Sequence, residues 1–208
     1  MTIPKSIIDE IRSRRGDPFD RSPEFIPICV LVARVAAYDK LAADGRLQTL
    51  SEVVSRSVDE LAESAEREDG YLEESLGRVT QVVFTGPQPV QAAAALRAAT
   101  ALAEITRPTE SPGRTIGKTA PVYGIALTAG LCARGTFGRK NRAIGISIGG
   151  ACARAYRIVE SAGPGEIILD DAFRRAFESS DALLPALQAV GAMYAVDEGT
   201  CFRVVRPR

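Results

Sequence analysis

Residues 26–35, with the sequence IPICVLVARV, form a nearly continuous run of apolar and β-branched side chains. A run of this length between breaking residues is typical of a strand at the centre of a sheet, covered by other elements on at least one face. The sequence therefore predicts a domain built around a sheet.

Helical and extended patterns alternate downstream of this run. Apolar residues recur at helical spacing over residues 47–65. An alanine-rich helix is predicted for residues 87–105, because proline suits the first helical turn, where no backbone donor is needed. Between the two helices lies a predicted hairpin with Gly77-Arg78 at its turn.

The C-terminal half continues the alternation. Residues 122–138 are predicted to form two strands joined near Ala129-Gly130, and residues 148–162 a turn that leads into a helix. The remaining predicted elements are a turn and a strand at residues 163–170, a helix capped by Asp170 or Asp171, and a hairpin at residues 192–205. The order predicts an α+β fold, with a mixed sheet and helices packed on one face.

The length of 208 residues suits one domain with an extension. Residues 1–24 are interpreted as an N-terminal helix or linker arm, and residues 25–208 as the folded domain. Residues 107–121, rich in Thr, Pro and Gly, are expected to form a flexible loop. The 26 basic and 26 acidic residues balance, so the net charge does not favour nucleic acid or an anionic membrane as a partner.

The chain contains no histidine, which excludes Ser-His-Asp and Cys-His catalysis and imidazole metal sites. Its four cysteines lack any Cys-x-x-Cys spacing and are expected to be free thiols in a reducing compartment. No leader and no apolar stretch long enough to cross a bilayer is recognisable. A cytoplasmic location is therefore expected.

Four phrases, taken in their order and spacing, resemble the catalytic domain of class III nucleotidyl cyclases, which make cyclic AMP or cyclic GMP. The resemblance covers about residues 26–205 and implies the ferredoxin-like fold of that family and dimerisation with a cyclase-fold subunit. The phrases are VLVARVAAYDKL (30–41), DGYLEESLGRVTQVVFTGP (69–87), GTFGRKNRAIGISIGGACARAYRI (135–158) and ESAGPGEIILDDAF (160–173).

The resemblance also locates two metal-binding positions. In the family, two aspartates hold two divalent cations that bind the triphosphate, and hard ions such as Mg²⁺ need anionic oxygen ligands. This sequence has Arg34 and Arg78 at those positions. Because two like charges 4 Å apart repel by ~4 kcal/mol at an effective dielectric of 20, we expect no metal and no cofactor there.

Other functional positions of the family have changed as well. The resemblance places Glu74 where the family has its base-selecting lysine, Gly150 at the acidic partner of that lysine, and Ala153 at the ribose-orienting asparagine. The arginine that stabilises transition-state charge is retained as Arg157. No catalytic residue is therefore expected, although Arg157 keeps its family identity.

These substitutions leave several hypotheses. Arg34, Arg78 and Arg157 are candidates for binding an anionic small molecule or nucleotide. Alternatively, the first two pair with local carboxylates such as Asp39 and Glu74. The first functional hypothesis is a catalytically degenerate domain that dimerises and acts in regulation or anion sensing. The alternatives are a heterodimeric cyclase subunit that supplies Arg157 in trans, and an active cyclase with atypical ligands.

Overall fold

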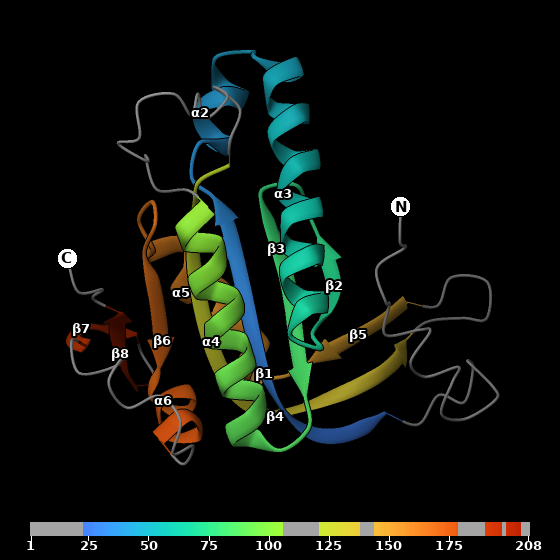
Figure 1. Ribbon diagram of the computed structural model, residues 1–208, viewed down its shortest axis with the longest axis vertical. Coiled ribbons are helices and arrows are strands. Elements are labelled where there is room, and N and C mark those ends of the chain that lie inside the picture. The colour runs from blue at the N-terminus through green and yellow to red at the C-terminus, as the bar shows by residue number, and fades with distance from the viewer. Residues whose placement is uncertain (1–22, 106–120, 138–143, 179–189, 197–198, 205–208) are drawn as a thin grey trace.

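The computed structural model describes residues 23–105, 121–137, 144–178, 190–196 and 199–204 (Figure 1). Residues 1–22 of the predicted N-terminal arm and residues 107–120 of the predicted loop lie outside these residues. The described elements are, in order, β1 (Glu24–Val35), α2 (Tyr38–Ala43), α3 (Leu47–Arg67), β2 (Tyr71–Ser75), β3 (Val79–Thr85), α4 (Gln88–Ile105), β4 (Tyr123–Phe137), β5 (Ile144–Ile148), α5 (Gly150–Ser161), β6 (Ile167–Asp170), α6 (Asp171–Glu178), β7 (Val190–Val196) and β8 (Gly199–Val204).

The described strands form one eight-stranded sheet in the order β2-β3-β1-β4-β6-β8-β7, with β5 added to β4. β1 lies inside this order and pairs antiparallel with β3 on one side and β4 on the other. β4 and β6 pair in parallel, so the sheet is mixed, as the sequence predicted.

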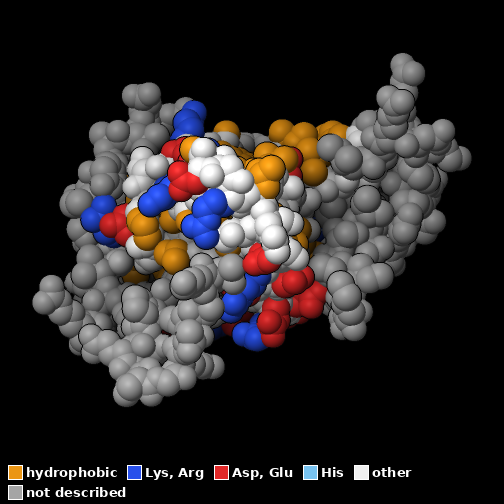
Figure 2. Space-filling model, turned by 90° about the horizontal axis from the view of Figure 1, so that it is seen from above, with side chains coloured by type: hydrophobic (Ala, Val, Ile, Leu, Met, Phe, Trp, Pro, Cys, Tyr) orange, Lys and Arg blue, Asp and Glu red, His pale blue; other side chains and the backbone are white. Residues whose placement is uncertain are grey.

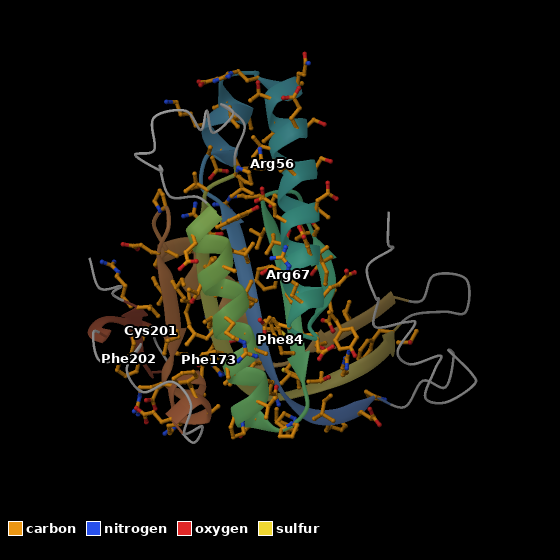
Figure 3. The ribbon with its side chains drawn as sticks, in the orientation of Figure 1. Arg56, Arg67, Phe84, Phe173, Cys201 and Phe202 are labelled. Atoms are coloured by element: carbon orange, nitrogen blue, oxygen red, sulfur yellow. The ribbon has the colours of Figure 1, made fainter. Side chains whose placement is uncertain are left out.

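Helices cover both faces of the sheet because β1 is apolar on both. Leu31 and Ala33 belong to the core beneath α3, α4 and α6, whereas Val30 and Val32 belong to the core beneath α5. Phe84 of β3 lies in the first of these cores (Figure 3). Each large apolar side chain buried in this way contributes roughly 1.5–3 kcal/mol. The α+β mixed sheet is thus confirmed, but its helices are divided between two faces instead of being confined to one.

The prediction of two strands joined near Ala129-Gly130 is wrong, because β4 runs unbroken through both residues. Gly130 pairs with Ile28 of β1 and lies under the start of α5, where a Cβ atom would meet the methyl group of Ala151 at 3.3 Å. The glycine therefore marks a close approach of a helix to the strand, not a turn. The second strand begins later, at Ile144.

The other predicted elements are confirmed in type and order. Asp170 caps α6, since its Oδ1 atom accepts a 2.7 Å hydrogen bond from the amide of Phe173. All four cysteines are free and buried. In the described part of the chain, no helix combines the length and the apolar character that a membrane span requires.

Candidate functional site

Arg34 stands near the end of β1, and its guanidinium reaches the C-terminal end of α5. Its Nε atom donates to the carbonyl of Val159 at 3.2 Å, and one terminal nitrogen donates to the carbonyl of Ala162 at 2.7 Å. Carbonyls at this end of a helix lack partners within the helix, and a positive charge there favours the helix dipole. Because α5 has no basic residue of its own in its last turn, Arg34 caps it from another strand.

A glycine on the neighbouring strand allows this contact. Gly124 of β4 pairs with Arg34, and a Cβ atom at Gly124 would lie 2.5 Å from the carbonyl oxygen of Ala162. The segment after α5 can therefore pass directly over β4 and present that oxygen to the arginine. Any larger residue at position 124 would push this segment away.

Arg78 stands at the tip of the β2–β3 hairpin, after Gly77, which has a φ of +73°. Its two terminal nitrogens donate to the two carboxylate oxygens of Glu160 at 3.0 and 2.7 Å, and its Nε atom lies 3.2 Å from a carboxylate oxygen of Asp39. Burial opposes the charge, but the bonds to Glu160 and the charge of Asp39 outweigh burial and raise the pKa of Arg78. The hairpin tip is thus fastened to α5 and to α2.

The two arginines converge on the last turn of α5. Arg34 binds its backbone carbonyls and Arg78 binds its acidic side chain, Glu160. Both positions that the resemblance assigns to metal ligands therefore present N–H donors instead of anionic oxygens, so these residues do not fit a divalent cation. Among the described residues, no cluster of three or more acidic or cysteine side chains is arranged to hold a metal.

The expected pairing with a local carboxylate is found for Arg78 but not for Arg34. Arg78 pairs with Asp39, as predicted, whereas Arg34 binds backbone carbonyls instead of a carboxylate. Glu74 accepts a 3.1 Å hydrogen bond from the hydroxyl of Tyr156 on α5. That bond joins β2 to the helix that also receives Arg34 and Arg78.

The remaining positions singled out by the resemblance lie along α5. Gly150 is its first residue, and Ala153 and Arg157 are exposed on it. Sequence reasoning missed Glu160, the partner that binds Arg78 in a bidentate manner. Because 82 residues separate the two in the chain, no local pattern could have identified the pair.

Sequence reasoning also missed a buried carboxyl group on β2, the first strand of the hairpin. The side chain of Glu73 is fully buried and accepts hydrogen bonds from the amide and hydroxyl of Ser147, both at 2.8 Å, and from Gln81 at 3.0 Å. Arg134 lies 3.8 Å from the same carboxylate and stacks on the ring of Tyr71. Burial raises the pKa of Glu73, while the bonds from Ser147 act in the opposite direction. This cluster joins β2 to β3, β4 and β5.

Sheet order, helix placement and the position of the hairpin define the class III adenylyl and guanylyl cyclase catalytic-domain fold. The guanylyl cyclase Cya2 matches with a TM-score of 0.67 at 16% identity, over 88% of this chain and 92% of that one. The adenylyl cyclase CyaB from P. aeruginosa matches with a TM-score of 0.67 at 16% identity, over 89% and 97%.

A third similar structure is the non-canonical dimeric guanylyl cyclase domain of the RhoGC fusion protein from the aquatic fungus Blastocladiella emersonii. It matches with a TM-score of 0.68 at 15% identity, over 87% of this chain and 97% of that one. No protein-family model matches the sequence, and no curated protein matches it. At these identities the likeness establishes the fold alone.

Proposed function

We propose that this chain is a catalytically degenerate cyclase-fold domain that acts as a dimerising regulatory module. The observation that carries the proposal is the attachment of Arg34 and Arg78 to the last turn of α5. Their N–H groups lie at the positions that the resemblance assigns to the anionic oxygen ligands of two-metal phosphoryl transfer. The changes at Glu74, Gly150 and Ala153 also remove the groups that the resemblance assigns to base and ribose recognition.

The contacts of the two arginines favour a regulatory role over anion sensing at these positions. An anion would have to displace Glu160 and Asp39 from Arg78, and two carbonyls from Arg34. Bidentate arginine–carboxylate pairs are among the stronger charge-assisted hydrogen bonds in proteins. We therefore assign to Arg34 and Arg78 the role of fixing β1 and the hairpin to α5.

Dimerisation is supported by an exposed apolar face on the extended end of the sheet, which we call the β1–β4–β5 face. Phe25, Leu131 and Ile148 are 69%, 65% and 48% exposed. They share one side of the sheet, because Ala133 pairs with both Phe25 and Ile148, and Leu131 pairs with Pro27 two residues further along β1. Contiguous exposed apolar residues of this kind mark association surfaces. A second copy of this chain is the proposed occupant, and the similar RhoGC domain, a non-canonical dimer, also associates with itself.

Sedimentation velocity of the purified protein tests this function. The unmodified chain is expected to sediment as a dimer at micromolar concentration, and Leu131→Glu, which places a charge in the apolar face, is expected to weaken the dimer at least about tenfold. Leu47→Glu is the matched control, because Leu47 is equally exposed, at 67%, but lies at the start of α3. A monomer at all concentrations, or equal effects of the two variants, would contradict the proposed dimer.

The alternative is a heterodimeric cyclase in which this chain supplies Arg157 to another subunit. The exposure of Arg157 on α5 is the observation that favours it. Against it stand Glu74 and Gly150, since a partner subunit would also need the base-selecting groups that they replace. Self-association of the purified chain, with no gain of activity on mixing with a metal-binding cyclase domain, favours the homodimer.

A further inference from the structure

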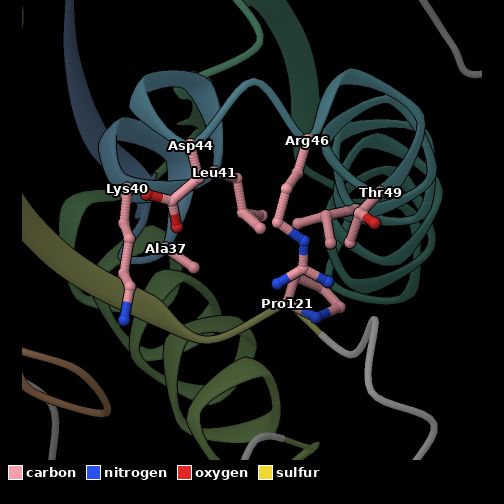
Figure 4. A pocket seen from close by; sticks show the side chains of 8 residues that line it. Ala37, Lys40, Leu41, Asp44, Arg46, Thr49 and Pro121 are labelled. Atoms are coloured by element: carbon pink, nitrogen blue, oxygen red, sulfur yellow. The ribbon is translucent and has the colours of Figure 1, made fainter.

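A hollow of about 230 Å³ lies between α2 and the start of α3. Asp39, which pairs with Arg78, is not among its lining residues. Figure 4 shows the side chains of Lys40 and Arg46 at its edges, with Asp44 and Leu41 between them. Figure 2 looks onto this end of the molecule and shows cationic side chains beside apolar ones. None of the roles proposed above uses this hollow.

The two cations of the hollow differ from the other basic residues that the structure describes. Within the described ranges, every other lysine or arginine has an ion pair, a hydrogen bond or another electrostatic contact. The side chains of Lys40 and Arg46 have no such contact with a described residue, yet both line the same hollow. Two cationic side chains that line one concave site, and that no carboxylate of a described residue binds, favour an anionic ligand.

The other lining residues define the size and chemistry of that ligand. Asp44 carries the one acidic side chain of the lining, so Lys40, Arg46 and Asp44 together leave a net charge of one positive unit (two minus one). Thr49 also lines the hollow, and Leu41 and Val53 form a buried apolar floor. The volume exceeds that of a phosphate ion and leaves room for a small apolar group beside it.

We propose that this hollow binds a small phosphate monoester, with the phosphate held by Lys40 and Arg46 and the organic part against Leu41 and Val53. The planar guanidinium of Arg46 suits two phosphate oxygens at once, while Lys40 acts as a mobile point charge. The site depends neither on dimerisation nor on the contacts of Arg34 and Arg78. It can therefore be tested independently of the proposed regulatory function.

Isothermal titration of the full-length chain with phenyl phosphate, inorganic phosphate and phenol tests the site. Phenyl phosphate is expected to bind at one equivalent per chain and more tightly than either of its parts, because charge and apolar floor contribute together. Lys40→Met and Arg46→Met are each expected to weaken binding about tenfold, as expected for the loss of one charge-assisted hydrogen bond. Asp44→Asn is expected to tighten it several-fold, since it removes a repelling charge.

Arg97→Met is the matched control, because Arg97 is also exposed but pairs with Glu68 away from the hollow. Its affinity for phenyl phosphate should equal that of the unmodified chain. The altered side chains are exposed and circular dichroism melts verify folding, so lost binding can be assigned to the site. Three results would overturn the proposal: no heat of binding at millimolar phenyl phosphate, equal binding of phenol, or affinity unchanged in the Lys40→Met/Arg46→Met double variant.

Discussion

Replacing Glu73 by alanine is expected to lower the free energy of unfolding by about 3–5 kcal/mol. The substitution removes the acceptor of three hydrogen bonds, from the amide and hydroxyl of Ser147 and from the side chain of Gln81. It also deprives the buried guanidinium of Arg134 of its nearby carboxylate. Removing one member of a buried charge cluster is costly because the remaining polar groups stay away from water.

Urea denaturation of the variant beside a matched control measures this effect. Glu63→Ala removes an exposed carboxylate whose partner is Arg67 on the outer side of α3, and it should cost less than about 0.5 kcal/mol (Figure 3). Similar midpoints for the two variants would show that the Glu73 cluster contributes little to the fold.

The same carboxyl group predicts a pH dependence with a defined sign. Burial raises the pKa of Glu73 above its ordinary value of 4.5, so between 4.5 and the raised value the folded chain retains a proton that the unfolded chain has released. Stability from this group is present below pH 4.5 and is lost as pH rises through the raised pKa. Glu73→Gln cannot titrate, so the difference in stability between it and the unmodified chain should change over this window. A difference that is constant with pH would contradict the raised pKa.

Replacing Arg34 by methionine is expected to lower the free energy of unfolding by about 1–3 kcal/mol. Methionine keeps most of the apolar length of the side chain but cannot donate to the carbonyls of Val159 and Ala162. Both acceptors belong to buried residues: the carbonyl of Ala162 would lose this donor, and that of Val159 would keep only the amide of Ala162. The C-terminus of α5 would also lose its compensating positive charge.

Arg67→Met provides the comparison, because Arg67 is 62% exposed and pairs within α3 with the exposed Glu63 four residues before it. Such a pair contributes only about 0.3–0.5 kcal/mol. Thermal unfolding followed by circular dichroism measures both variants. If Arg34→Met is no less stable than Arg67→Met, Arg34 does not fix α5 to β1.

Local patterns predicted the order of the elements because each carries its own periodicity or turn signal. The apolar run became β1, and the hairpin turn at Gly77-Arg78 is where the sequence predicted it. Even the pairing of Arg78 with Asp39 was among the expectations. Spacing along the chain and the resemblance to the cyclases were sufficient for these features.

Long-range contacts lay beyond sequence reasoning. Glu160 is 82 residues from Arg78, and the carbonyl of Ala162 is 128 residues from Arg34. Every residue has a backbone carbonyl, so residue types do not reveal which carbonyl accepts a hydrogen bond. The capping role of Arg34 could therefore not be predicted from the sequence. Gly130 had a signal, but a glycine in a strand marks either a turn or a close approach, and only packing against α5 distinguishes the two.

Cyclic nucleotide formation by the purified chain, measured with ATP and with GTP over a range of Mn²⁺ and Mg²⁺ concentrations, tests the central claim most directly. If arginines bound to α5 occupy both metal positions, product should stay at the level of a protein-free control at every metal concentration. Metal-dependent turnover by the unmodified protein would contradict the account.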